Sequence, residues 1–165
     1  MKIPITLNGE RTVLDAEPGE NLQTTLRRLN LFSIKLGCSE GLCGNCMVLL
    51  DGKPVPSCTL PVGILRDCSI VTLEYFSKAE PVYNDIINGF RQAGIHMCGY
   101  CNAGKILSTY SILNEPVLAS DEEILDCVRN LNPCCTDRDT LIHGIKLAYS
   151  IKLNREGKTN NGKKL

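Results

Sequence analysis

The pattern of apolar and polar positions changes near residue 75. Before that point, short runs alternate between apolar and polar side chains, as Ile3, Ile5 and Leu7 do, and turn residues such as Asn8-Gly9 separate the runs. A period of two is typical of half-buried strands, and Asn-Gly favours a tight hairpin. We therefore expect strands at 3–7, 11–15, 47–50, around 55 and at 69–74, with a short helix at 22–29.

After residue 75 the apolar positions recur at helical spacing, which predicts four amphipathic helices. Ser120 and Glu123 have the spacing of a capping box at the start of the third. The expected helices cover 81–92, 102–113, 120–128 and 138–152. The chain is therefore expected to be α+β, with a strand-rich domain at 1–76, an all-α four-helix bundle at 77–153 and a polar, disordered tail at 154–165.

Composition narrows the classes of function. The 165 residues carry a formal net charge of zero, and 43% are hydrophobic and 22% charged, as in globular proteins. A neutral chain has no long-range attraction for nucleic acid or anionic membranes. No run approaches the length of a membrane span and the start lacks a secretory h-region, so we expect a cytoplasmic protein. In that reducing compartment the ten cysteines indicate metal or redox chemistry rather than disulfides.

The first cysteine group comprises Cys38, Cys43, Cys46 and Cys58. The first three have the spacing of plant-type ferredoxins, with the fourth ligand arriving later in the chain. A [2Fe–2S] cluster needs four thiolates, two for each iron, and this group can supply them. A zinc site or buried free thiols are the alternatives, although zinc sites commonly pair two short C-x2-C elements instead.

Three glycines lie in the same loop, at Gly37, Gly41 and Gly44. Glycine can adopt left-handed backbone conformations and lets the main chain approach an inorganic core. Backbone N–H groups brought near in this way can donate hydrogen bonds to cluster sulfurs. The loop is therefore expected to wrap closely around the first cluster.

The second cysteine group comprises Cys98, Cys101 and the adjacent pair Cys134-Cys135, each at a junction between expected helices. Cys98 and Cys101 precede a helix, where free N–H groups and the macrodipole stabilise thiolates. Spacing alone leaves a [2Fe–2S] cluster, a zinc site or two unrelated pairs open for this group.

Taken together, the two groups resemble the small iron–sulfur subunit of the xanthine dehydrogenase, or molybdenum hydroxylase, family. The segment 37–46 (GCSEGLCGNC) looks like the family's G-C-x-x-G-x-C-G-x-C loop, and Ser57-Cys58 falls where its fourth ligand lies. The segment 98–101 (CGYC) resembles its C-G-[FY]-C motif, and Asn130-Leu131 resembles the start of its N-L-C-R-C-T-G motif. The resemblance covers roughly residues 3–152.

The resemblance implies a β-grasp ferredoxin domain followed by a helical domain, each with one [2Fe–2S] cluster. The subunit would bind no substrate itself. It would relay electrons one at a time from a large molybdopterin subunit to a medium FAD subunit, in a dimer of heterotrimers. The substrate, chosen by the molybdenum subunit, is expected to be a purine or another heteroaromatic compound.

Three departures from the family pattern concern the second cluster. Asn132 stands where the family has its third cysteine, and we hypothesise that Cys135 supplies the missing thiolate across a sharp turn at Pro133. Met97 replaces a glutamine that hydrogen-bonds the pterin in the family, and the family's T-P-G is Asn-Ala-Gly at 102–104. A stand-alone ferredoxin-like carrier, with one cluster and a zinc or empty second site, is the alternative function. A purely structural zinc protein is a third.

The remaining reactive residues have simpler interpretations. Cys68 and Cys127 are expected to be buried, inert core thiols, with Cys127 a conceivable substitute ligand. His96 is expected at the surface and His143 on a helix, in structural roles. Tyr100, between two ligands, is expected to serve packing.

Overall fold

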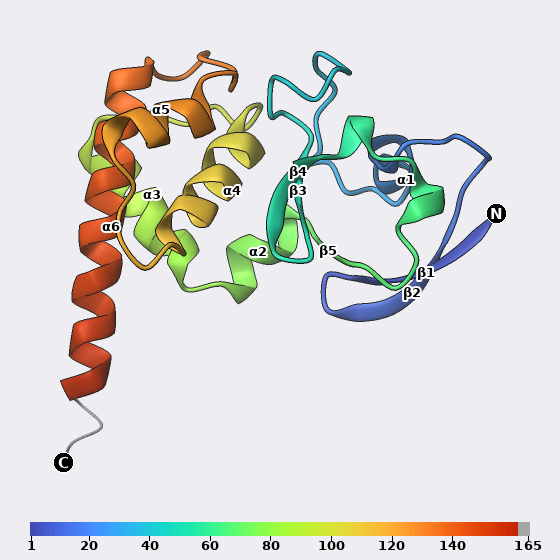
Figure 1. The fold of residues 1–165 in the computed structure, drawn as a ribbon, viewed down its shortest axis with the longest axis horizontal. Coiled ribbons are helices and arrows are strands. Elements are labelled where there is room, and N and C mark those ends of the chain that lie inside the picture. Colours follow the sequence, from blue (N-terminus) through green and yellow to red (C-terminus); the bar gives the residue numbers. More distant parts are fainter. Residues whose placement is uncertain (162–165) are drawn as a thin grey trace.

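The computed structural model describes residues 1–161, which form two bodies lying side by side (Figure 1). The first body holds the elements β1 (Lys2–Leu7), β2 (Glu10–Asp15), α1 (Leu22–Arg28), β3 (Met47–Leu50), β4 (Lys53–Pro56) and β5 (Ser69–Val71). Within the described residues the strands form one sheet in the order β2-β1-β5-β3-β4. β1 and β2 make an antiparallel hairpin, whereas β1 and β5 are parallel, so the sheet is mixed.

The β1–β2 hairpin turns at Asn8 and Gly9, whose φ angles of 52° and 84° are both left-handed, as the Asn-Gly pair predicts. α1 lies on one face of the sheet, where Leu22 and Leu26 are buried against apolar residues of the strands. A mixed sheet with a helix packed on it confirms the ferredoxin-like β-grasp arrangement expected for this half. The expected strand at 69–74 is shorter than predicted, because the chain turns at Thr72 into a helix that the sequence pattern missed.

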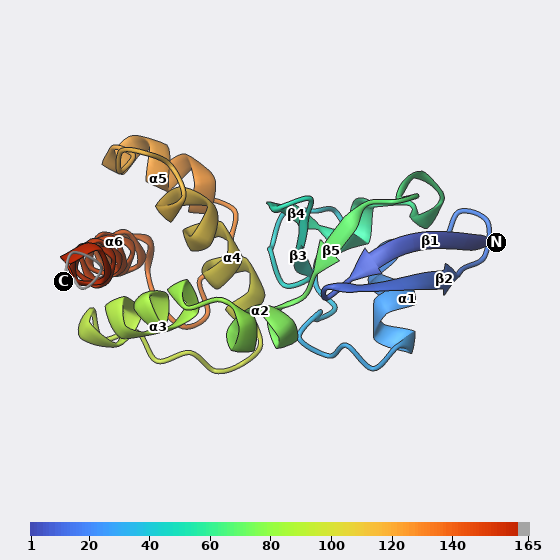
Figure 2. The same cartoon turned by 90° about the horizontal axis from the view of Figure 1, so that it is seen from below.

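That helix, α2 (Leu73–Ala79), bridges the two bodies (Figure 2). Its Phe76 is fully buried in the core of the helical body, which explains why the chain leaves the sheet there. The expected domain boundary at residue 76 falls inside this helix, and the division at that residue stays a prediction.

The helical body contains the four expected helices, α3 (Val82–Gln92), α4 (Asn102–Leu113), α5 (Asp121–Val128) and α6 (Arg138–Asn161). Ser120 and Glu123 form the predicted capping box of α5. The expectation of a disordered tail from 154 is wrong as far as Asn161, because α6 continues to that residue. Arg155 on this extension donates to the buried carboxylate of Asp85 on α3 at 2.8 Å. The tail's last residues, 162–165, lie outside the described part of the chain.

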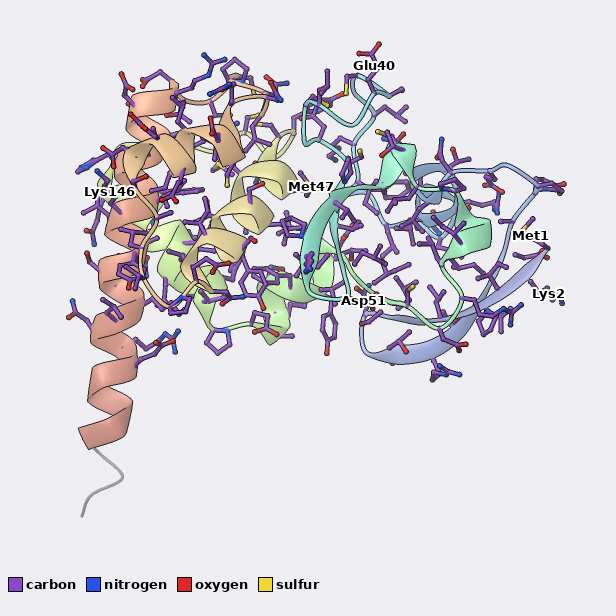
Figure 3. All side chains as sticks on the ribbon, viewed as in Figure 1. Met1, Lys2, Glu40, Met47, Asp51 and Lys146 are labelled. Carbon is purple, nitrogen blue, oxygen red and sulfur yellow. The ribbon has the colours of Figure 1, made fainter. Side chains whose placement is uncertain are left out.

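The two bodies share strand β3, whose side chains alternate between two cores. Met47 and Leu49 are buried in the core of the helical body, whereas Val48 is buried between the sheet and α1. Met47 lies where the sheet meets the helices (Figure 3). This shared strand fixes the two cysteine-bearing halves relative to each other. Within residues 1–161, no helix has the length and apolar character that crossing a membrane requires.

Gly89 sets the closest approach in the helical body, between α3 and α6. A Cβ added there would lie 2.4 Å from the backbone nitrogen of Ala148. We expect Gly89→Ala to force the two helices apart and to lower the free energy of unfolding by about 1–3 kcal/mol, as overpacking does. Thermal unfolding measures this. Gly157→Ala is the matched control, because Gly157 is exposed on α6 with nothing within 4 Å of its added Cβ. Equal melting temperatures for the two variants would contradict the packing.

Candidate metal centres

The first cysteine group is assembled from one loop and one 3-10 turn. Cys38, Cys43 and Cys46 lie between α1 and β3, and Cys58 lies in the turn Ser57–Thr59 after β4. Ser57 donates to the Cys46 carbonyl from its backbone N–H at 3.2 Å and from its hydroxyl at 2.7 Å. These bonds hold the turn against the loop. In the same group, Cys38 and Cys43 each donate a backbone N–H to the other's sulfur, and Cys58 lies beside Cys46.

Backbone N–H groups point at the sulfurs of this loop. The N–H groups of Glu40, Leu42 and Cys43 donate to Cys38 Sγ at 3.3–3.4 Å. Hydrogen bonds from Cys43 and Glu40 lower the pKa of the Cys38 thiol to about 7, because they stabilise the thiolate. Burial, together with the neighbouring Cys46, raises the pKa of Cys58 to about 11. The N–H groups around Cys38 therefore favour a thiolate at that sulfur, whereas the Cys58 thiol keeps its proton until a bound metal displaces it.

Gly37 leaves the space that the loop needs for its sulfur atoms. A Cβ at Gly37 would lie 2.5 Å from Cys43 Sγ. Gly41 and Gly44 have φ angles of 79° and 75°, a region that other residues rarely adopt. The loop projects beyond the sheet, with Glu40 at its outer tip (Figure 3). A cradle of this kind, with thiols and N–H groups turned inward, fits a [2Fe–2S] cluster.

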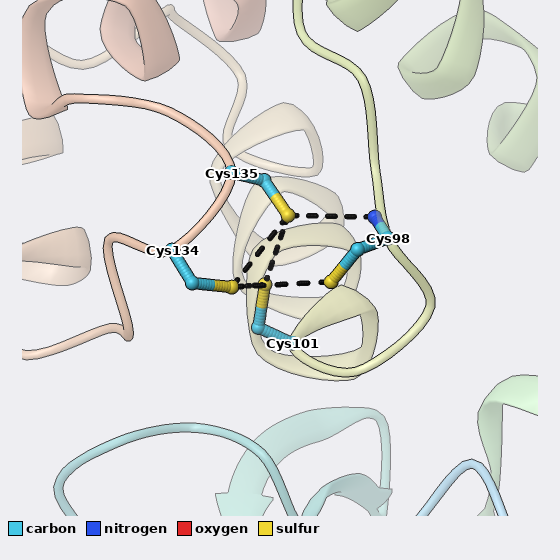
Figure 4. A group of neighbouring side chains, drawn as sticks. All are labelled: Cys98, Cys101, Cys134 and Cys135. Atoms are coloured by element: carbon cyan, nitrogen blue, oxygen red, sulfur yellow. Dashed lines mark hydrogen bonds between the residues drawn. The ribbon is translucent and has the colours of Figure 1, made fainter.

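The structure brings the second group together in one compact tetrad, defined here as Cys98, Cys101, Cys134 and Cys135 (Figure 4). Their four Sγ atoms all lie within 4.8 Å of one another. Cys101 Sγ is 3.0 Å from Cys134 Sγ and 3.7 Å from Cys135 Sγ. Cys98 and Cys101 come from the segment that enters α4, and the other two come from the loop between α5 and α6. Four thiols with no carboxylate or imidazole among them form a soft donor set, which suits iron–sulfur clusters.

A tight turn explains how two adjacent cysteines join one tetrad. The Thr136 N–H donates to the Pro133 carbonyl at 3.3 Å, so that Cys134 and Cys135 are the two central residues of the turn. The side-chain oxygen of Asn132 accepts the Cys134 N–H at 3.1 Å and steadies the entry to this turn. Cys135 Sγ in turn accepts the Cys98 N–H at 3.4 Å. The sharp bend expected at Pro133 is therefore present.

The thiols of this tetrad differ in their affinity for protons. A hydrogen bond from the Tyr100 backbone, then the neighbouring Cys135, lower the pKa of Cys98 to about 7. The neighbouring Cys101, followed by burial, raises the pKa of Cys134 to about 12. Burial also raises the pKa of Cys135. Four thiols this close cannot all ionise, because their negative charges repel one another, unless a cation lies between them. A bound metal ion supplies that cation, so this arrangement is typical of a metal-binding tetrad.

The two cysteine loops are in direct contact with each other. The Asn132 N–H donates to the Cys43 carbonyl at 3.1 Å, and the Tyr100 hydroxyl donates to the Leu36 carbonyl at 2.6 Å. Gly44 and Gly104 pack backbone against backbone, since a Cβ on Gly104 would lie 2.8 Å from the Gly44 carbonyl oxygen. The two candidate centres are therefore held in fixed proximity.

Several expectations for single residues need correction. Cys127 is exposed rather than buried in the core, because only Ile124 and Val128 of α5 turn fully inward, and it lies outside the tetrad. Cys68 is half-buried rather than fully buried. Tyr100 is 49% exposed and links the two loops instead of packing. His96 lies at the surface, as expected.

Sequence reasoning missed Lys105 altogether. It lies one turn after Cys101 on α4, is 1% exposed, and places its Nζ 3.0 Å from Cys101 Sγ. Its position four residues after a ligand, on a predicted helix, was the available signal.

Comparison with known proteins agrees with this geometry. Residues 5–64 match the model of the 2Fe-2S iron-sulfur cluster binding domain, and residues 72–146 match that of the [2Fe-2S] binding domain. The nicotinate dehydrogenase small FeS subunit of Eubacterium barkeri is 39% identical over 74% of this chain and 78% of its own length. The xanthine dehydrogenase iron-sulfur-binding subunit of Escherichia coli O157:H7 is 35% identical over 69% of this chain and 71% of its own length.

A solved structure, quinoline 2-oxidoreductase from Pseudomonas putida 86, has a chain that superposes with a TM-score of 0.77 at 31% identity, covering 92% of this chain and 96% of that one. The matches across both halves mean that this chain carries two [2Fe–2S] clusters and serves as an electron-transfer subunit of an oxidoreductase with further subunits. The chain belongs to the small iron–sulfur subunits of the xanthine dehydrogenase, or molybdenum hydroxylase, family.

Proposed function

We propose that eight of the ten cysteines hold the two clusters. In this assignment Cys38, Cys43, Cys46 and Cys58 ligate the first, and the tetrad of Cys98, Cys101, Cys134 and Cys135 ligates the second. The observation that carries the proposal is the second tetrad, whose four Sγ atoms all lie within 4.8 Å of one another. Gly37, Gly41 and Gly44 contribute the backbone cradle of the first cluster.

The chain's own part in the reaction is to position two one-electron carriers and to keep them close. Bound [2Fe–2S] clusters supply the redox chemistry, one electron at a time. The N–H groups around Cys38 and Cys98 stabilise charge on sulfur. The hydrogen bonds from Asn132 to the Cys43 carbonyl and from Tyr100 to the Leu36 carbonyl hold the two loops together. No residue of this chain needs to touch the substrate.

The partners in this proposal are a large subunit with molybdopterin and a medium subunit with FAD, assembled as a dimer of heterotrimers in the cytoplasm. Electrons pass from the molybdopterin through the second cluster and then the first to FAD. The first loop projects beyond the sheet, and the second tetrad lies beside it, where α4 begins and the loop after α5 runs (Figure 1). Ten free thiols and a formal net charge of zero are compatible with a cytoplasmic complex of this kind.

The proposed substrate of the complex is a purine or another nitrogen heteroaromatic compound. The relatives described above are named for nicotinate and xanthine, and the similar solved structure for quinoline. All three are flat nitrogen heterocycles, hydroxylated at a ring carbon in this proposal. The choice among them belongs to the partner subunit.

The test is to produce the chain with a purification tag in its native cells and to isolate what it binds, without oxygen. The proposal predicts two larger subunits carrying molybdenum and flavin, and reduction of the flavin when nicotinate or xanthine is added. The same complex carrying Cys98→Ser should keep its molybdenum and flavin but lose substrate-driven flavin reduction. Isolation of the chain as a monomer, with neither cofactor, would instead favour the stand-alone carrier.

A further inference from the structure

Lys105 is a buried lysine whose surroundings are unusual. It is 1% exposed, on the first turns of α4, in a helical body whose other fully buried positions are mostly apolar. Buried ammonium groups are almost always paired with an anion, since removing an unpaired charge from water is very costly. Among the described residues, no carboxylate lies within ion-pair distance of its Nζ.

The Nζ has two partners instead, and both belong to the second tetrad or its loop. It donates to Cys101 Sγ at 3.0 Å and to the Asn132 carbonyl at 2.5 Å. Cys101 is itself 2% exposed. The anion that pairs with this lysine is therefore a thiolate of the tetrad, through Cys101. The ammonium approaches that sulfur from the protein interior, where water does not screen the attraction between them.

The position of Lys105 also ties the unusual loop to α4. Asn132 receives the ammonium on its carbonyl, accepts the Cys134 N–H on its side chain, and donates its own N–H to Cys43. A continuous series of hydrogen bonds thus runs from Cys43 of the first group, through Asn132 and Lys105, to Cys101 of the second. Removing the ammonium would change the charge beside the tetrad. It would leave the N–H to sulfur bonds of the first cysteine group in place.

We propose that Lys105 is the counter-cation of the second cluster and raises its reduction potential above the value that four thiolates alone would give. This inference rests on the proposed assignment of the second tetrad. Two ferric ions, two sulfides and four thiolates sum to a charge of minus two, and uptake of one electron makes the charge minus three. A fixed ammonium at a ligand sulfur stabilises both forms and the reduced form more, because the attraction grows with the charge. The electron enters from the preceding redox centre and leaves to the next, and no proton is transferred.

The consequence is directional. A higher potential makes the second cluster a better acceptor of electrons from the molybdopterin side. It also raises the reduction potential of the second cluster relative to that of the first, where the described donors to Cys38 Sγ are backbone N–H groups. Lys105 is a positioning residue that acts through the cluster ligands and touches no substrate.

The test is a redox titration with dithionite, followed by EPR, of the purified holoprotein and three variants. Lys105→Met removes the charge with a side chain of similar length, Lys105→Arg keeps a cationic donor, and Lys152→Met is the matched control. Lys152 is a half-buried lysine whose Nζ donates to the Leu113 carbonyl, at the opposite end of α4 from the tetrad.

We expect Lys105→Met to lower the equilibrium constant for reduction of the second cluster at least tenfold relative to the first, which is about 59 mV for a one-electron couple. The reduction potential of the first cluster should stay close to its wild-type value in Lys105→Met. In Lys105→Arg and Lys152→Met, the potentials of both clusters should stay close to those of the wild type. If Lys105→Met fails to assemble the second cluster while Lys105→Arg assembles it, this difference shows that the second cluster requires a cation at position 105.

Two results would overturn the role of Lys105 alone. One is a Lys105→Met protein with both clusters and unchanged potentials. The other is loss of the second cluster in both Lys105 variants, which would mean that the shape of lysine matters and its charge does not. A wild-type protein with only one cluster is a different failure, because it would overturn the assignment of the second tetrad itself.

Discussion

Replacing Cys135 with alanine is expected to halve the iron content of the chain, from about four irons to about two, since each [2Fe–2S] cluster holds two. Its Sγ is one of four within 4.8 Å of one another and accepts the Cys98 N–H. No other described cysteine belongs to that group, so the variant would leave three thiolates for a cluster that needs four. One of the two EPR signals of the reduced protein should disappear and the other should remain.

Cys127→Ala is the matched control for this variant. Cys127 is the residue that could substitute as a ligand on sequence grounds, yet it is exposed on α5 and lies outside the tetrad. The Cys127→Ala variant should therefore keep about four irons per chain and both EPR signals. If Cys127→Ala loses iron and Cys135→Ala keeps it, the turn at Pro133 does not present the ligands as described.

A second large effect is expected at Gly37, beside the first cluster. A Cβ there would overlap Cys43 Sγ at 2.5 Å and approach the Asn45 side chain at 3.1 Å. Cys43 Sγ accepts the Cys38 N–H at 3.4 Å, and the Cys43 N–H donates to Cys38 Sγ at 3.3 Å, so displacing the thiol would disturb this reciprocal pair. We expect Gly37→Ala to lose the first cluster and about two irons per chain, with the second EPR signal intact.

Gly63→Ala in the same half controls for a general loss of folding. Its added Cβ would make only an ordinary contact, 3.6 Å from Met1 Sδ, and its φ is not left-handed. This variant should retain both clusters. Full iron content in Gly37→Ala would show that the loop has more room around Cys43 than the structure gives it.

Local sequence pattern was sufficient for most of the fold. The strands at β1, β2 and β3 and the helices from α3 to α6 follow from alternation, helical spacing and the capping box at Ser120. α2 was missed because its turn out of the sheet depends on Phe76, which is buried in the core of the other body. The continuation of α6 past residue 154 depends likewise on a distant partner, the bond from Arg155 to Asp85. Contacts between remote segments leave little trace in local periodicity.

The candidate site divides in the same way. Cysteine spacing and the family resemblance predicted the four thiols that gather in the second tetrad, including Cys135. The ligand set of the first cluster stays a prediction. What they could not give is the environment of those thiols. The burial of Lys105 and its approach to Cys101 depend on how α4 packs against the loop at Asn132. The contact between Asn132 and Cys43 joins residues from opposite halves of the chain and has no local signal.

Iron and acid-labile sulfide, measured per chain on protein purified without oxygen, test the central claim most directly. Two clusters held by eight cysteines require about four of each, with two distinct EPR signals after reduction. A value of about two irons and two sulfides, with a single signal, would mean that the tetrad at Cys98, Cys101, Cys134 and Cys135 does not hold an iron–sulfur cluster.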